Sequence, residues 1–380
     1  MKRLAILFLL VLAPAPTVAL ADGCPLPCSG QNASPEGSKF LFVQPNGPGG
    51  ELVAWSTASR QVVFGLPPGM ASADGAWYYS AERLGGRTVL KRFATATAQQ
   101  RGNWILAGRW RLQSVSPTGR WAALARHVAR STQLVVFDGN LGRRVHVMRL
   151  RGNFEVETIS RDGKKLFLIQ RLEGRAYNVR QYDLSNERLV ANPLRAAGVK
   201  IMAGYAWSGV ASPDGRWLMT LYLSTPDSMA FVHSLDLERG RPACIALPSV
   251  GGLERLKRYS LTLAPDGRTL FAANPALGAV ARVDLATSRV KRITRFPRSK
   301  PVAGVHAATL STISRNGRTM YFSGGRDLWA YDAAYGVVRG PYETGGKIVG
   351  VGYGGGDRLV FAVREDGRML AFRAATGARA

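Results

Sequence analysis

The sequence has few of the residues from which metal and redox centres are built. Its 380 residues include three cysteines and four histidines, which are His127, His146, His233 and His306. No two histidines lie at the spacing of a metal-binding pair such as His-Glu-x-x-His, and there is no Cys-x-x-Cys pair. We therefore expect no metal and no cofactor from local motifs, although residues distant in sequence can still meet in a fold.

Motifs that activate a nucleophile or hold a phosphate are also missing. There is no Gly-x-Ser-x-Gly elbow, no Gly-x-x-x-x-Gly-Lys-Ser/Thr loop and no Gly-x-Gly-x-x-Gly after a strand. The glycine-rich run 350–354 precedes no helix whose N-terminus could hold a phosphate. No catalytic residue is predicted, which favours a non-enzymatic role and leaves an enzyme as the alternative.

Long apolar runs are absent beyond the N-terminus. A positively charged start, the apolar run 4–12 and the small-residue pattern Ala19-Leu20-Ala21 are typical of a signal peptide. We predict a signal peptide over residues 1–21, cleavage before Asp22, and export to the periplasm or the extracellular space. No later run approaches membrane length, so no transmembrane segment is expected in the mature chain.

The three cysteines allow at most one disulfide. Cys24 and Cys28 stand in the Cys-Pro-Leu-Pro-Cys part of a short segment, residues 22–33, whereas Cys244 lies far away in the sequence. A Cys24–Cys28 bridge is our interpretation for an oxidising compartment. Lipid attachment at Cys24 is the alternative, although Asp22 fits the required small, apolar pattern poorly.

Acidic residues are scarce. The chain has 51 Lys and Arg against 25 Asp and Glu, a formal charge of +26 that falls by two when Lys2 and Arg3 leave with the signal peptide. Such a surface attracts polyanions, including lipid headgroups and acidic polysaccharides. The basic residues are scattered along the chain, which equally suits a solvated surface, and export argues against a nucleic acid as partner.

What the sequence does contain is a short repeated motif, Ser-Pro-Asp-Gly-Arg with variations, followed by an apolar run. Its copies begin at Ser34, Ala73, Ser116, Ser160, Ser212, Ala264 and Ser314, with a degenerate copy over 355–358. The spacing of about 38 to 52 residues is typical of propeller blades and similar arrays.

The residues of the motif predict a tight turn between two strands. Proline fixes φ at the first turn position, Asp or Asn bonds to the backbone two residues on, and Gly adopts positive φ without a clash. Strand-like runs such as 165–169 and 217–222 follow, and a later strand ends in an Asp-Leu pattern, as in 234–237. Four short antiparallel strands per unit make a propeller blade.

The chain resembles the bacterial WD40-like propellers with the PD40 repeat seen in TolB-type proteins, and the YVTN-repeat surface propellers. Residues 264–274, with 283–287, carry the closest match. The resemblance implies an all-β fold, a β-propeller of four-stranded blades over residues 34–380. It implies no chemistry, because the motif specifies turns and strands.

The motif count favours eight blades, and seven is the alternative. Residues 38–66 and 346–373 each supply about three strands, so neither end is a complete blade. We expect the two termini to close the ring, since closure removes exposed sheet edges.

We predict a binding or scaffold module for another protein or an anionic envelope component. The alternative is a propeller-class enzyme, lactonase-like or cofactor-dependent dehydrogenase-like, with a site at the central channel. Insertions over 186–212 and 239–262 are basic, and loops are where propellers bind. The predicted contact residues are Arg195, Lys200, Arg239, Arg241, Arg255, Lys257 and Arg258.

Overall fold

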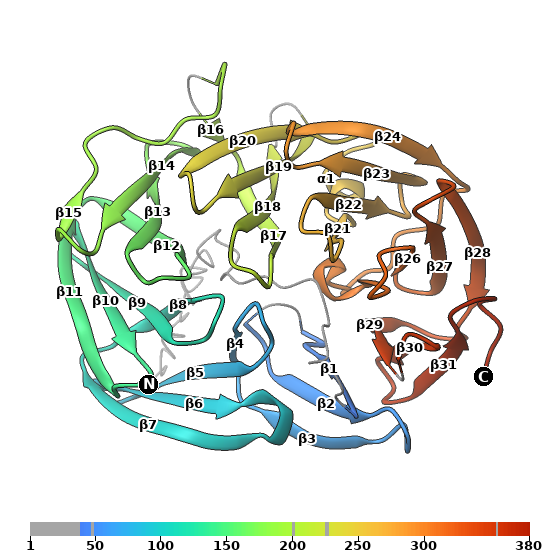
Figure 1. The fold of residues 1–380 in the computed structure, drawn as a ribbon, viewed down its shortest axis with the longest axis horizontal. Helices are drawn as coiled ribbons and strands as arrows, with labels where there is room; N and C mark the ends of the chain where they lie inside the picture. Colours follow the sequence, from blue (N-terminus) through green and yellow to red (C-terminus); the bar gives the residue numbers. More distant parts are fainter. Residues whose placement is uncertain (1–38, 47–48, 200–201, 225–227, 355) are drawn as a thin grey trace, which may run out of the picture.

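Eight antiparallel β-sheets surround a central axis in a computed structural model that describes residues 39–46, 49–199, 202–224, 228–354 and 356–380 (Figure 1). The all-β propeller predicted from the repeats is confirmed, and the blade number is eight. Within the described residues, no helix is long and apolar enough to cross a membrane.

The strands of the first four blades follow one another along the chain. They are β1 (Phe40–Val43), β2 (Leu52–Ser56) and β3 (Val62–Leu66); β4 (Gly69–Ala71), β5 (Trp77–Leu84), β6 (Arg87–Ala94) and β7 (Gln99–Ala107); β8 (Arg111–Val115), β9 (Trp121–Val128), β10 (Ser131–Asp138) and β11 (Arg143–Arg151); and β12 (Asn153–Ile159), β13 (Lys165–Arg171), β14 (Ala176–Asp183), β15 (Arg188–Leu189) and β16 (Met202–Ala203).

The other four blades follow in the same way. They are β17 (Tyr205–Ala211), β18 (Trp217–Ser224), β19 (Met229–Asp236) and β20 (Arg241–Ala246); β21 (Ser260–Leu263), β22 (Thr269–Asn274), β23 (Ala279–Asp284) and β24 (Arg289–Arg295); β25 (Ser311–Ile313), β26 (Thr319–Ser323), β27 (Asp327–Asp332) and β28 (Val337–Glu343); and β29 (Ile348–Gly354), β30 (Leu359–Arg364) and β31 (Met369–Arg373). Helical turns are η1 (Thr95–Thr97), α1 (Leu253–Leu256) and η2 (Ala307–Thr309).

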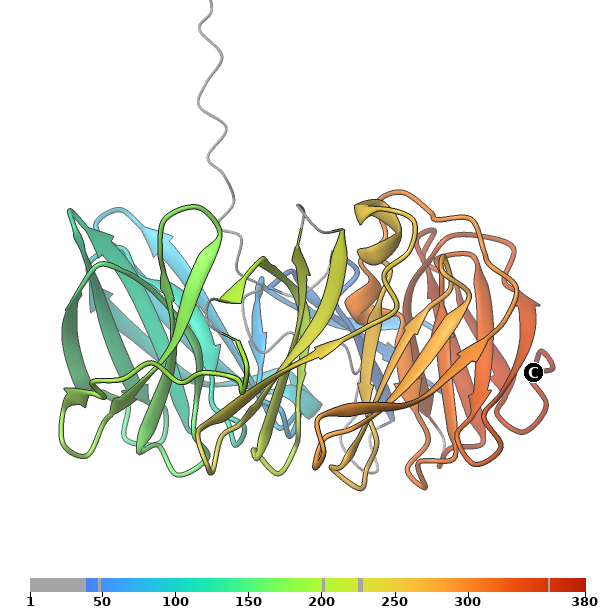
Figure 2. The same ribbon diagram turned by 90° about the horizontal axis from the view of Figure 1, so that it is seen from above.

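Each four-stranded blade has two ends with different connections. The turns after its first and third strands lie at one end, and these ends together form what we call the turn face. The turn after the second strand and the connection to the next blade lie at the opposite end, the loop face. Figure 2 shows the two faces edge-on, with α1 as the gold coil at the top, on the loop face.

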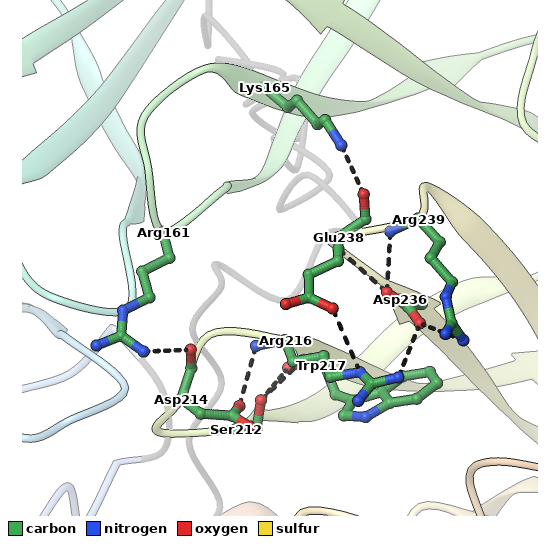
Figure 3. Close-up of polar contacts among 9 residues, drawn as sticks. All are labelled: Arg161, Lys165, Ser212, Asp214, Arg216, Trp217, Asp236, Glu238 and Arg239. Atoms are coloured by element: carbon green, nitrogen blue, oxygen red, sulfur yellow. Dashed lines mark hydrogen bonds and ion pairs between the residues drawn. The ribbon is translucent and has the colours of Figure 1, made fainter.

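The Ser-Pro-Asp-Gly motif forms the first turn of the blade, as predicted. In blade 5 the Trp217 N–H donates to Ser212 Oγ (2.7 Å) and the Arg216 N–H donates to Asp214 Oδ1 (3.0 Å) (Figure 3). Gly215 has φ of 75°, in the left-handed region that a side chain disfavours. The turns also connect blades, because Lys165 Nζ of blade 4 donates to the Glu238 carbonyl of blade 5 (2.6 Å).

The turn after the third strand is as regular as the first, although its sequence varies more. Blades 2 to 8 place one left-handed residue there, and blade 1 places one in the matching turn between β2 and β3; the residues are Arg60, Ala98, Gly142, Glu187, Gly240, Ser288, Gly336 and Gly377. Only four of these are glycine, so the repeat was hard to see in the sequence. The Asp of the Asp-Leu pattern begins many of these turns: Asp138 Oδ1 accepts the N–H groups of Asn140 (2.8 Å) and Leu141 (3.1 Å).

Side chains alternate between the two neighbours of a blade. In β18, every residue of which is buried, Leu218 and Tyr222 pack toward blade 4, whereas Met219 and Leu221 pack toward blade 6. This two-residue period follows from strand geometry. The apolar core therefore lies between blades, in separate clusters around the ring.

The ring closes where blade 1 meets blade 8, which are both three-stranded sheets. Leu41, Val43 and Trp55 of blade 1 share one buried cluster with Val349, Phe361 and Met369 of blade 8. A short bridge between Phe372 and Arg379 adds the beginning of a fourth strand to blade 8. The expected closure by the two ends of the propeller is thus seen for the described residues.

We predict that Asp138→Asn destabilises the protein by about 2 kcal/mol, because a buried charged partner of Arg120 is lost. Asp138 is fully buried and accepts from Arg120 Nε (3.0 Å) and Nη2 (2.9 Å). Burial opposes its charge, but the bonds from Arg120, Leu141 and Asn140 outweigh burial and lower its pKa. The stabilisation is therefore present above the carboxyl's unfolded pKa and lost as pH falls through the folded one.

Urea unfolding at neutral and acidic pH measures this effect. The control is Asp284→Asn, at the same turn position in blade 6, where the carboxylate is more exposed and Lys291 lies 3.6 Å away. We expect Asp284→Asn to lower the free energy of unfolding by less than Asp138→Asn does. A loss for Asp138→Asn that persists unchanged in acid would contradict the assignment.

Candidate functional site

Within the described residues, four innermost strands carry a β-bulge, and each bulge leaves one residue without a cross-strand partner. The residues are Gln113 in β8, Glu157 in β12, Trp207 in β17 and Val349 in β29. A bulge re-aims the side chain of the extra residue. Gln113 Oε1 accepts the Val156 N–H (2.7 Å), so the side chain of this bulge residue reaches from blade 3 to blade 4.

Trp207 is the bulge residue that reaches the loop face. Its ring stacks on His306, with centroids 5.5 Å apart and planes 9° apart. Trp207 Nε1 donates to the Lys257 carbonyl (2.9 Å), and Lys257 Nζ lies 5.3 Å from the indole centroid, within cation–π range. Tyr205 meets Trp207 edge-on, and Arg175 of blade 4 lies over Tyr205. The result is a half-buried aromatic group bordered by the cations Lys257 and Arg175, and Lys257 Nζ also pairs with Glu254 Oε1 (2.6 Å).

Two inter-blade connections hold this aromatic group in place. Residues 247–259 carry α1, and residues 296–310 carry η2, which contacts the inner strands β17, β21 and β29. Arg258 Nη1 donates to the Val305 carbonyl (2.9 Å), so it fastens one connection to the other. Burial and, second, Arg258 lower the pKa of His306 to about 4, so His306 is neutral near pH 7. The positive charge of the site comes from lysine and arginine.

A hollow of about 300 Å³ lies beside α1 on the loop face. It is lined by Pro248, Val250, Leu277, Gly278, Arg295, Phe296 and Arg298. Tyr259 hydroxyl donates to the Pro248 carbonyl (2.7 Å) and fixes its inner wall. Apolar walls with two guanidinium groups suit a partner that is both apolar and anionic.

The structure divides the predicted contact residues between two faces. Arg255, Lys257 and Arg258 lie in or directly after α1, on the loop face. Arg239 and Arg241 lie at the opposite end of blade 5, on the turn face, where Arg239 is 3.9 Å from Asp236 (Figure 3).

The remaining predicted residues are placed elsewhere or not described. Arg195 is exposed on the outer side of blade 4, next to the bridge between Leu194 and Val179. Lys200, Cys24 and Cys28 lie outside the described residues. Cys244 is half-buried, and burial raises the pKa of its thiol to about 11.

Sequence reasoning missed a buried polar pair between blades 4 and 5. His233 Nδ1 lies 3.8 Å from Glu157 Oε1, and both side chains are sealed from solvent. Burial raises the pKa of Glu157 to about 8 and lowers that of His233 to about 4, so both are neutral at pH 6. A sealed pair cannot meet a ligand directly, and we assign it a structural role. No local signal could reveal it, because the bulge at Glu157 depends on strand register.

The described inner strands carry few titratable groups that could converge at the axis. Their charged residues are Arg111, Glu155 and Glu157, and Glu155 is held by Arg171 at 2.8 Å. In the part of the chain that is described, no three His, Cys, Asp or Glu residues are placed to hold a metal. Lys257 and Arg258, in contrast, meet Trp207 and His306 at a surface, which favours binding.

We predict that Glu157→Gln stabilises the protein as pH rises. A carboxyl whose folded pKa is raised contributes its full stability below the unfolded pKa and loses it as pH rises through the folded value. The wild type should therefore weaken between about pH 4.5 and 8, and the variant should gain on the order of 3 kcal/mol at pH 8. Urea unfolding at pH 5 and 8 tests this, with the exposed Glu173→Gln of the same blade as control. A gain of equal size at both pH values would rule out the buried carboxylate as its cause.

No protein-family model and no curated protein sequence matches the chain. Among solved structures, it is similar to dipeptidyl peptidase 4 of Porphyromonas gingivalis (TM-score 0.57, 11% identity), over 93% of this chain and 59% of that one. It is similar to the dihydro-heme d1 dehydrogenase NirN, solved in complex with DHE (TM-score 0.54, 16% identity), over 92% and 74%. It is also similar to the Dos1 propeller (TM-score 0.53, 10% identity), over 88% of each chain. At these identities the likeness shows the propeller fold alone.

Proposed function

We propose that the protein is an exported β-propeller, periplasmic or extracellular, that binds an envelope partner through the loop face of blades 5 to 7. The observation that carries the proposal is the aromatic and basic surface of Trp207, Lys257 and Arg258, held between two connections. Signal-peptide features of residues 1–21 support export.

The chemistry of this surface suits an acidic partner, a protein or another anionic envelope component. Tryptophan and arginine are the residues that contribute most at interfaces, because they combine contact area with hydrogen bonding. The neighbouring hollow adds Arg295 and Arg298 beside the apolar Phe296 and the exposed Val250. A partner with an anionic side chain next to an apolar one would contact both the two arginines and the apolar residues of the hollow.

A propeller-class enzyme is the second candidate, because two of the similar structures are a peptidase and a dehydrogenase. A site at the axis would need convergent acids, bases or a nucleophile. The described inner strands supply mainly apolar and small residues, so we rank binding first.

We also infer kinship with the PD40 and YVTN-repeat propellers. The Ser of the motif bonds to the Asp or Asn of its own turn in more than one blade, as in Ser160–Asp162 of blade 4 (2.6 Å) and Ser314–Asn316 of blade 7 (2.7 Å). This supports a shared blade design and does not identify the partner.

We predict that Arg255→Gln with Lys257→Gln weakens partner recovery about tenfold, because two cations at the surface are lost. Mature chain is used as bait in envelope extract at low and at moderate salt. The matched control is Arg239→Gln with Arg241→Gln, which removes two charges from the turn face of the same blade. Arg258 is left intact, since it fastens residues 296–310.

A partner retained at moderate salt by wild type and control, and lost by the loop-face variant, supports the proposal. Equal recovery by both variants contradicts it. Recovery of polyanions alone, lost as salt rises, would show that net charge and not this surface drives association.

A further inference from the structure

Acidic residues are almost absent from one continuous stretch of the chain. Residues 83–154, which span most of blade 2 and all of blade 3, contain fourteen Lys and Arg and one acid, Asp138. The stretch therefore carries thirteen net positive charges, half of the chain's +26. Asp138 is buried and bound to Arg120 near the turn face, so it does not offset charge on the loop face.

A hollow of about 540 Å³ lies at the loop-face end of blade 3, within this stretch. Its lining is Ala129, Arg130, Ser131, Arg149 and Arg151. The first two form the turn between β9 and β10, and the two later arginines end β11. Blades 4 and 5 lie between blade 3 and α1, so this is a separate place on the loop face (Figure 1).

Strand geometry directs the three guanidinium groups toward one space. Arg149 and Arg151 are two residues apart in β11, so they lie on the same side of the sheet, and Arg151 faces Ser131 in register. Arg149 Nε donates to Ser131 Oγ (2.9 Å), which fixes its orientation and leaves its two Nη groups for a ligand. Ala129, which has φ of 51°, lines the hollow with a single methyl group.

Nothing anionic in the described residues neutralises this group. None of the three arginines forms an ion pair there, and Glu155 of the next blade is already bound to Arg171. Like charges held close on a hairpin repel one another, and an anion between them would remove that repulsion. Planar guanidinium groups bind phosphate oxygens in pairs, which makes arginine the usual residue of phosphate sites.

Protection of the sheet edge explains basic residues on other outer strands. On β24, Lys291 lies 3.6 Å from Asp284, and Arg292 Nη1 donates to the Tyr335 carbonyl (3.1 Å). Among the described residues, the side chains of the three arginines of the blade 3 hollow have no carboxylate or carbonyl partner, and Arg149 bonds to the Ser131 hydroxyl alone, which sets the hollow apart from a charged sheet edge.

We propose that this hollow is a binding site for a phosphate-class oxyanion, carried by a lipid headgroup or by a soluble phosphate. The site is independent of the α1 surface and shares no residue with it. Three cations in a space of this size favour a group with more than one negative charge, such as a pyrophosphate or a phosphomonoester.

Calorimetric titration of the mature chain with pyrophosphate, and sedimentation with vesicles that contain or lack an anionic phospholipid, test the proposal. The variant Arg130→Gln, Arg149→Gln, Arg151→Gln should lose affinity at least about tenfold for whichever source binds. A second variant, Ala129→Glu, keeps all three arginines and should lose binding by placing a carboxylate in the hollow. Thermal unfolding verifies that both variants are folded.

The matched control is Arg101→Gln, Arg143→Gln, Arg144→Gln, which removes three exposed charges from β7 and β11 away from the hollow. Saturable binding of pyrophosphate that the hollow variants lose and the control keeps supports a soluble phosphate. Binding only to anionic vesicles, with the same pattern, supports a headgroup. Equal loss in control and hollow variants, or no saturable binding to either probe, overturns the proposal.

Discussion

The packing of each blade between its two neighbours is the interaction on which the rest of the structure depends. A strand such as β18 is buried along its whole length because alternate residues enter two different cores. Burial of apolar surface contributes roughly 25 cal/mol per Å², and a blade alone would leave both of its faces in water. An open row of blades would expose Leu41 and Trp55 at one end and Val349 and Phe361 at the other, so closing the ring follows from the same burial.

Because inter-blade packing fixes the strands, the two faces of the ring tolerate changes of sequence and length to different degrees. On the turn face, the motif residues satisfy their own backbone, as Ser212 and Asp214 do in blade 5, and changes there cost stability. On the loop face, the connections range from the single residue Gly152, between β11 and β12, to residues 296–310, which carry η2. A connection that only has to reach the next blade can take on length, aromatic residues and charge, and loops on a rigid scaffold are where binding residues gather.

The parts that the sequence predicted are those whose physics is local. Proline, aspartate and glycine in a turn determine φ and hydrogen bonds within five residues, so the repeats predicted the fold, the blade number and the incomplete end blades. The second turn was less visible, since Ala98, Glu187 and Ser288 occupy left-handed positions where glycine would have marked the repeat. The site was predicted only in part: Lys257 and Arg258 were named, but their contact with Trp207 and His306 joins three blades, and no spacing in the sequence expresses that contact.

The distribution of acids, more than the number of bases, determines where the positive charge of this protein can act. Outer strand β24 carries four Lys or Arg and no acid, a pattern that keeps a sheet edge from pairing with another chain. Charge used in that way is exposed and screened by salt, so it attracts polyanions without selecting among them. Selection requires cations fixed in a shape, as Lys257 is over Trp207 and as Arg149 is by Ser131. Both places lie on the loop face, where a rigid ring holds side chains that its own turns do not need.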